Sequence, residues 1–353
     1  MNSKIAAYGV IMTLLFSLVG CGQSGTEPTT PQSQKVVVVS WGGSYQAAQK
    51  TAMFDPFIKD TGIALTEDSP IDMGKLKSMV ESKDVQWDVA DVESKDIPRL
   101  VSEGILEPID YTVVNKTDLL ESAATEYGVG IDYYSTVMAY NKNTLPAGLT
   151  PNNWADFFDI NKFPGKRAVR KNPIMIMEIA LLADGVDPKS LYPLDIDRAF
   201  KKLDTIKNEI VWYDQNAQPV QLLSDKEVVM ASVSNGRILD AQKQGQPLDY
   251  TYQDGLLDSE AWVIPKGTKN RDAALKFINY ASQAKPQADL LNTIPYGPTN
   301  TKVFELMDPQ YAKTLPTYPE NLNKQVLLNG QWWNDDGNYD KINDRFQAWL
   351  IKK

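Results

Sequence analysis

One arginine and two acids supply the charges that a site for a small ligand needs. Arg237 follows Asn-Gly at the predicted start of a helix, where its guanidinium can present a two-pronged donor to a carboxylate. Asp258 and Glu260 lie further along the chain and can accept an ammonium group. Together these residues predict a site for a zwitterion. In the alternative interpretation, Arg237 pairs with Asp258 or Glu260, and the acidic cleft takes a diamine.

The composition excludes several kinds of catalysis. The chain contains no histidine and a single cysteine, Cys21. Imidazole is therefore ruled out as base, nucleophile or metal ligand, and a Ser-His-Asp triad cannot form. Carboxylate catalysis remains, so a glycosidase-like hydrolase using Asp88, Asp91 and Glu93 is the alternative from another class. Strand alternation would point Asp88 and Asp91 to opposite faces of the sheet, which disfavours such a pair. We therefore expect that the protein is not an enzyme and that it uses no cofactor or metal.

Net charge and aromatic content narrow the kind of ligand. The formal net charge is −9, and the chain contains 8 Trp and 16 Tyr. An acidic chain disfavours nucleic acid as a partner, although acidity also serves solubility alone. Flat aromatic rings combined with acids are suited to holding an amine. We therefore expect a protein that binds a small-molecule amine. We also expect it to be a monomer.

The first residues predict export and anchoring. Lys4 precedes an apolar run over 5–19, which is too short to span a bilayer and is followed by Gly20 and Cys21. This arrangement resembles the bacterial lipobox, in which the signal peptide is cut before a cysteine that then carries lipid. A plain signal peptide with an incidental cysteine is the alternative. The stretch 22–34 lacks apolar residues and suits a mobile tether. We expect a membrane-anchored lipoprotein outside the cytoplasm, on the periplasmic side or at the cell surface.

Strand and helix patterns alternate along the rest of the chain. The β-branched run over 35–40 indicates a buried strand, and Trp41-Gly-Gly-Ser-Tyr45 forms the turn after it. Strands alternating with helices indicate a parallel, doubly wound α/β sheet, and the length indicates two lobes. We expect further strands at 62–66, 87–92, 137–141, 210–213 and 257–264, and helices at 46–61, 73–82, 177–183, 196–207, 271–281 and 346–351.

Four motifs in this order carry a resemblance to a known family. They are Trp41–Tyr45, Ser234-Asn-Gly-Arg237, Ala261-Trp-Val-Ile-Pro-Lys-Gly267 and Ile294-Pro-Tyr-Gly-Pro-Thr-Asn300. The set resembles the solute-binding proteins of bacterial ABC importers, in the spermidine/putrescine-binding branch with its relatives for 4-aminobutyrate. The resemblance covers nearly all of 35–353.

The resemblance implies an α/β fold with two lobes that close over a ligand in the cleft between them, of the type II-like periplasmic-binding-protein kind. It implies capture of a polyamine or an ω-amino acid and delivery to an ABC permease in the membrane. A receptor domain that feeds a sensor is a further alternative. The expected division of the chain is a signal peptide at 1–20, a tether at 21–34, lobe 1 at 35–141 and 265–300, and lobe 2 at 142–264 and 301–353.

The same resemblance suggests most of the ligand contacts. Trp41, Tyr45 and Tyr296 match aromatic positions that line the amine site of the polyamine branch. Tyr133 and Tyr134 also match a pair that binds iron in ferric relatives, which is the alternative for that stretch. The branch often has Trp where this chain has Ser234, and the Glu-Ser-Lys run after the third strand is also a departure. The predicted ligand-binding residues are Trp41, Ser44, Tyr45, Glu93, Ser94, Tyr134, Ser135, Arg237, Asp258, Glu260 and Tyr296, with Cys21 as the lipidated residue.

Overall fold

The computed structural model describes residues 34–352 of the chain. The predicted signal peptide, Cys21 and all but the last residue of the tether lie outside the described residues. Within 34–352, eleven strands form a sheet whose main path is β2-β1-β3-β9-β5-β8-β6-β7. No described helix is long and apolar enough to cross a membrane.

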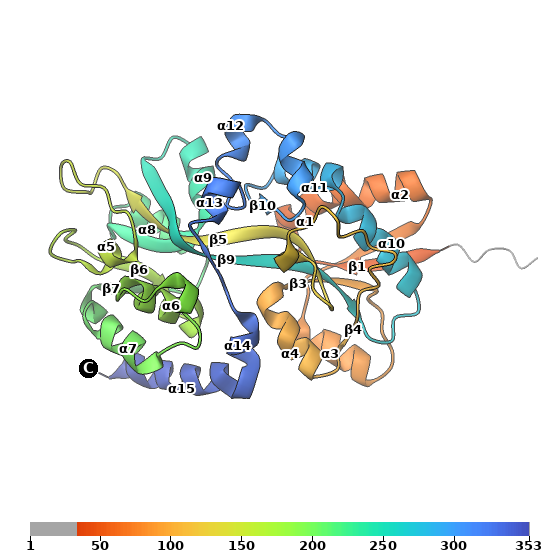
Figure 1. The fold of residues 1–353 in the computed structure, drawn as a ribbon, viewed down its shortest axis with the longest axis horizontal. Coiled ribbons are helices and arrows are strands. Elements are labelled where there is room, and N and C mark those ends of the chain that lie inside the picture. Colours follow the sequence, from red (N-terminus) through yellow and green to blue (C-terminus); the bar gives the residue numbers. More distant parts are fainter. Residues whose placement is uncertain (1–33, 353) are drawn as a thin grey trace, which may run out of the picture. The chain divides into compact units, whose positions relative to one another are not determined.

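The strands divide into two parallel groups and two long antiparallel strands. The first group is β1 (Lys35–Val39), β2 (Ala64–Asp68) and β3 (Val89–Glu93), and the second is β6 (Arg167–Arg170), β7 (Ile210–Tyr213) and β8 (Met230–Ser234). We call these groups with their helices the β1 half and the β6 half. The strands β5 (Val129–Asn141) and β9 (Leu248–Pro265) run antiparallel to each other and join the halves (Figure 1).

These long strands correct the predicted parallel sheet. β5 begins eight residues before the predicted strand at 137–141, because polar residues such as Asp132 and Tyr134 interrupt the apolar run at its start. β9 begins at Leu248, well before the predicted strand at 257–264. A chain that crosses from one half to the other and later returns must run in opposite directions, so the two crossing strands pair antiparallel.

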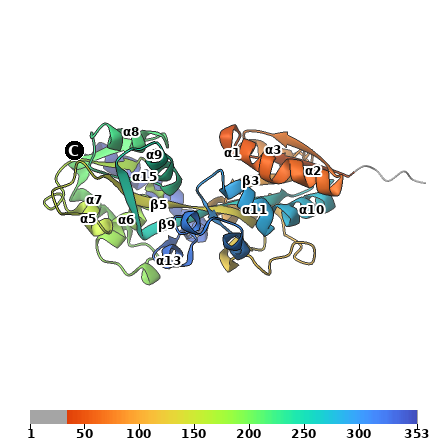
Figure 2. The ribbon, with the colours of Figure 1, turned by 90° about the horizontal axis from the view of Figure 1, so that it is seen from above.

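Helices surround each half of the sheet (Figure 2). Those of the β1 half are α1 (Gly43–Gln49), α2 (Asp55–Thr61), α3 (Met73–Glu81), α4 (Ile97–Ser102), α10 (Arg271–Ala281) and α11 (Ala284–Leu291). Those of the β6 half are α5 (Trp154–Phe158), α6 (Pro173–Ala183), α7 (Ile196–Asp204), α8 (Gln218–Ser224), α9 (Asn235–Lys243) and α15 (Asn338–Ile351). Short elements complete the chain: β4 (Leu106–Glu107), β10 (Gly297–Pro298), β11 (Val326–Leu327), α12 (Pro309–Ala312), α13 (Pro319–Leu322) and α14 (Gly330–Asn334).

The predicted helix at 46–61 begins three residues earlier than expected. The chain turns into α1 through Gly42 and Gly43, whose φ angles of 79° and 62° favour glycine. A π-helical turn at Lys50–Phe54 links α1 to α2, which ends at Thr61. The first glycine turn of the sequence thus places Trp41 and Tyr45 beside the end of β1, as a ligand-facing turn requires.

Each half has its own buried apolar cluster. In the β1 half, Phe54, Phe57, Trp262 and Phe277 are buried and contact one another at ring-centroid distances of 5.3–6.3 Å. In the β6 half, a larger cluster around α5, α6 and α7 also contains Phe346 and Trp349 of α15. Burial of such side chains drives folding, so the carboxyl-terminal helix is an integral part of the β6 half.

The short helix α14 contacts both halves. Its Trp333 Nε1–H donates to the buried carboxylate of Glu178 on α6 at 2.6 Å, and the Tyr192 hydroxyl donates to the same oxygen at 2.7 Å. On the other side, the Asn334 side chain donates to the main-chain oxygen of Lys95 at 2.9 Å. Gly330 packs so closely that an added Cβ would lie 2.5 Å from Lys95 Cα. This helix therefore supports the backbone that follows β3.

A methyl group at Gly330 tests this contact. Gly330→Ala forces a clash with main-chain atoms that cannot rotate away, so we expect about 1–3 kcal/mol loss of stability in chemical unfolding. The matched control is Gly74→Ala on α3, whose added Cβ would meet only an Asp72 side-chain oxygen at 3.2 Å. Equal stabilities for the two variants would contradict the close packing of α14 on the β1 half.

Candidate ligand-binding site

An open cavity lies between the two halves. Its lining includes Glu93 at the end of β3, Arg170 at the end of β6 and Ser234 at the end of β8. Ligands of open α/β sheets bind beyond the carboxyl ends of the strands, and this cavity has that position.

Acids from three neighbouring strands form one side of the site. In the sheet register, Glu260 of β9 lies opposite Glu93 of β3 and also opposite Asp132 of β5. Asp258, two residues before Glu260, lies on the same face of β9 and opposite Tyr134. We call Glu93, Glu260 and Asp132 the acidic row. Like charges directly opposite each other destabilise a sheet, so the row needs donors or cations around it.

Two predicted aromatic residues donate to this row. The Trp41 indole N–H donates to Glu260 Oε2 at 3.1 Å, and the Tyr45 hydroxyl donates to Asp132 Oδ2 at 2.6 Å. Trp41 is 38% exposed and Tyr45 is half-buried. Burial raises the pKa of Asp132 to about 8, and burial next to Asp91 raises the pKa of Glu260 well above its ordinary value. In Asp132 and Glu260, unlike in Glu93, the surroundings therefore favour the protonated form of the carboxyl group.

A lysine that we did not predict lies among the remaining acids. Lys95 Nζ forms ion pairs with Glu93 and, at 3.3 Å, with Asp258. The Tyr134 hydroxyl lies 3.0 Å from Glu93 and 2.9 Å from Asp258. Burial opposes ionisation of Glu93, but the charge and hydrogen bond of Lys95, the Tyr134 hydroxyl and the charge of Arg170 together outweigh it and lower the pKa of Glu93. Glu93, Lys95 and Asp258 thus form a compact charged cluster.

Two guanidiniums belong to the β6 half. Arg170 ends β6, and Arg237 lies in the first turn of α9. Both are exposed, both line the cavity, and within residues 34–352 neither forms an ion pair. The alternative pairing of Arg237 with Asp258 or Glu260 is therefore wrong for this structure, since Asp258 pairs with Lys95.

The start of α9 is held by polar and close apolar contacts. The Asn235 side chain accepts from the main-chain N–H of Ser135 at 3.0 Å and donates to Pro295 O at 3.1 Å. Gly236 allows Tyr296 to approach, because an added Cβ would lie 2.8 Å from the ring. These contacts explain why Asn-Gly precedes Arg237: the amide orients the helix, and the glycine leaves room for the aromatic wall.

Aromatic and apolar side chains form the rest of the wall. The Tyr296 ring centroid lies 6.0 Å from that of Tyr134 and 6.5 Å from that of Tyr45. Across the cavity, Ile174 and Met175 of α6 present apolar atoms. Met175 has a φ of 72°, a strained backbone conformation of the kind that concentrates at binding sites. The Thr136 hydroxyl donates to its sulfur at 3.0 Å.

The structure brings the predicted residues together to different degrees. Lining the cavity are Glu93, Tyr134, Arg237, Glu260 and Tyr296. Directly behind or beside these lie Trp41, Tyr45, Ser94, Ser135 and Asp258, which contact them or their strands. Ser44 is exposed on α1. Their contact with a ligand stays a prediction.

Tyr133 and Tyr134 do not act as a pair. Tyr134 lines the cavity, whereas Tyr133 is buried on the opposite face of β5 and contacts the Ser122 hydroxyl at 2.6 Å. Alternation along the strand separates them, as it does any two neighbours. Among the described residues no cluster of three His, Cys, Asp or Glu side chains is arranged for a metal ion.

Several residues of the site escaped the sequence analysis. Lys95 stands in the Glu-Ser-Lys run that departs from the family pattern, and this departure was the available signal. Arg170 ends the stretch 167–170, so the rule that strand ends meet at the site would have found it. No local signal marks Asp132 or Met175, since only strand register and the kink in α6 bring them to the site.

Comparison with known proteins agrees with this geometry. A model of the family described as bacterial extracellular solute-binding protein matches residues 52–319. The gamma-aminobutyric acid-binding protein of Pseudomonas aeruginosa is 38% identical over 91% of this chain and 92% of its own length. The spermidine/putrescine-binding periplasmic protein of Escherichia coli is 22% identical over 83% of this chain and 86% of its own length. The solved structure of the Atu4243-GABA receptor is 42% identical, with a TM-score of 0.82 over 90% of this chain and 98% of its own.

The chain belongs to the bacterial extracellular solute-binding proteins. It has their two-lobe α/β fold, and it is a binding protein, not an enzyme. The hydrolase alternative is thereby set aside. Proteins of this kind act outside the cytoplasm, where they bind a small-molecule solute for delivery to a permease.

The raised pKa of Asp132 predicts how stability depends on pH. The folded state keeps the carboxyl protonated up to about pH 8, whereas an unfolded Asp loses its proton near pH 4, so stability falls as pH rises through this window. Asp132→Asn keeps an acceptor for Tyr45 and removes the titration. We expect the variant to gain about 3–5 kcal/mol relative to the parent between about pH 5 and pH 8, measured by chemical unfolding.

The exposed Asp344→Asn on α15 is the control for this measurement. Parallel pH profiles for the parent and the Asp132 variant would contradict a protonated carboxyl at this position.

Proposed function

We propose that this protein binds a small ω-amino acid of the 4-aminobutyrate class. The observation that carries the proposal is the separation of charges across one cavity. Two guanidiniums without ion-pair partners among residues 34–352, Arg170 and Arg237, belong to the β6 half, and the acidic row lies on β3, β9 and β5. A ligand with one cationic and one anionic end complements both sides, and relatives named for gamma-aminobutyric acid support the choice.

In this arrangement the ligand carboxylate contacts Arg237 and Arg170, and its ammonium contacts Glu260. Guanidinium–carboxylate pairs are charge-assisted hydrogen bonds, each worth about 1.5–3 kcal/mol. The rings of Tyr296 and Trp41 stand beside the acids, where faces of aromatic rings favour a cation and the alkyl chain between the two charges. A ligand ammonium beside Glu260 favours the ionised form of that carboxyl group, which burial opposes.

A ligand held at both ends draws the two lobes together. The cavity is lined from the β1 half and from the β6 half, so a bound zwitterion contacts both and has higher affinity for a closed form. We propose that β5 and β9, which the two lobes share, flex as the hinge and that the closed form is delivered to an ABC permease. A lipid on Cys21 would keep the protein at the membrane. We propose that the protein acts there as a monomer.

Thermal shift assays on residues 34–353 test the proposed ligand class. A ligand that binds only the folded form raises the melting temperature. We expect 4-aminobutyrate to raise it and to raise it more than putrescine or spermidine does. No shift with any of these amines would overturn the assignment of the ligand and would leave the fold and family untouched.

Substitution of Arg237 tests which group meets the carboxylate. We expect Arg237→Ala to weaken 4-aminobutyrate binding by about tenfold or more in isothermal titration, and Arg237→Lys to weaken it less, because lysine keeps the charge without the fork. The control is Arg345→Ala on α15, which removes a surface arginine paired with Asp197. An unchanged affinity in Arg237→Ala would remove this residue from the site.

A further inference from the structure

We propose that Lys95 determines which amines this protein accepts, by filling an ammonium position inside its own ligand site. The lysine takes up two of the carboxylates that would otherwise receive a second ligand ammonium. The site then accepts an ω-amino acid and excludes a diamine. This inference rests on the proposed function and assigns its selectivity to one residue.

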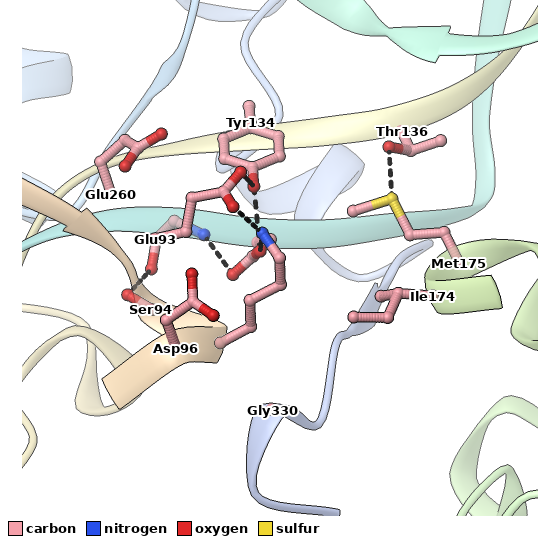
Figure 3. A network of polar contacts seen from close by, with 12 residues as sticks. Glu93, Ser94, Asp96, Tyr134, Thr136, Ile174, Met175, Glu260 and Gly330 are labelled. Carbon is pink, nitrogen blue, oxygen red and sulfur yellow. Dashed lines mark hydrogen bonds and ion pairs between the residues drawn. The ribbon is translucent and has the colours of Figure 1, made fainter. Parts of the chain in front are cut away.

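The geometry places Lys95 where an amine ligand would bind. Its Nζ pairs with Glu93 and lies 3.3 Å from Asp258, and the Tyr134 hydroxyl bridges the same two carboxylates (Figure 3). An ammonium between acids, with an aromatic hydroxyl between them, is the environment that a protein offers to a bound amine. Glu93, Lys95 and Tyr134 all line the cavity, so the cluster belongs to the site.

Lys95 is held in place more firmly than a surface lysine. Its side chain is 15% exposed, and its main-chain oxygen accepts from Asn334 of α14 at 2.9 Å. Gly330 packs directly against its backbone. Because α14 is in turn bonded to Glu178 of the β6 half through Trp333, the backbone of Lys95 is connected to both halves.

Counting charges shows what the lysine changes. The charged side chains that line the cavity are the cations Lys95, Arg170 and Arg237 and the acids Glu93 and Glu260, and Asp258, which pairs with Lys95, is a third acid. With Lys95 paired to two of the acids, Glu260 is the cavity acid that remains for a ligand ammonium. A diamine brings two ammonium groups, and its second one would meet the guanidiniums. Without Lys95 the same site would offer three carboxylates against two cations.

Neutral substitutions of Lys95 test the proposal. We expect Lys95→Met and Lys95→Gln to bind putrescine about tenfold tighter or more than the parent in isothermal titration, since each frees Glu93 and Asp258 for a ligand cation. Lys95→Arg keeps the cation and should leave putrescine binding as weak as in the parent. The matched control is Lys77→Met, which removes a lysine paired with Glu103 on the surface.

Glutamine guards against loss of folding, because its neutral amide can donate a hydrogen bond where methionine cannot, to carboxylates that keep only the Tyr134 hydroxyl and main-chain donors. Putrescine should also restore the melting temperature of both neutral variants toward that of the parent, which a lysine with a purely structural role would not produce.

Unchanged putrescine affinity in both neutral variants would overturn the role of Lys95, as would a parent protein that binds putrescine as tightly as 4-aminobutyrate. A parent that binds neither compound would overturn the proposed ligand class. In that case a gain of putrescine binding in the variants would still support the role of Lys95, and no gain would overturn it.

Discussion

Carboxylates side by side on neighbouring strands are the constraint on which the rest of this site depends. Glu260 lies opposite Glu93 on one side and Asp132 on the other, so three acids share one face of the sheet. Water cannot solvate all of them, and like charges in that register repel. The surrounding structure supplies a donor or a cation to each acid: Trp41 contacts Glu260, Tyr45 contacts Asp132, and Lys95 pairs with Glu93. A ligand ammonium is a further cation that would reduce the repulsion between these acids.

The two crossing strands place these acids opposite positively charged side chains. β5 and β9 belong to both halves of the sheet, so the acids they carry face guanidiniums that come from β6 and α9. A cavity with acids on one side and arginines on the other distinguishes the two ends of a ligand, which a uniformly acidic cleft does not. The helix α14 adds a contact between the halves and at the same time positions the backbone of Lys95. The helix α14 therefore both supports Lys95 and connects the two halves.

Likeness to relatives and local chemistry contribute different information. The relative named for gamma-aminobutyric acid and those named for polyamines share one family, and overall likeness alone leaves both ligand classes open. The two ligand classes are distinguished by a few charged side chains at strand ends. In this chain, the residue after Ser94 is a lysine, and its ammonium is already placed among the acids.

Local patterns in the sequence determined the elements and the kind of chemistry. Apolar runs located β1, β3 and β7 to within two residues, helical periodicity located α10, and the absence of histidine excluded whole classes of catalysis. Only the tertiary structure decided which charges meet. The pairing of Lys95 with Asp258, the register that sets Glu260 beside Asp132, and the free state of Arg237 within residues 34–352 all depend on contacts between segments far apart in the chain. Sequence patterns report neighbours along a strand or helix, whereas ion pairs and strand register follow from packing between elements.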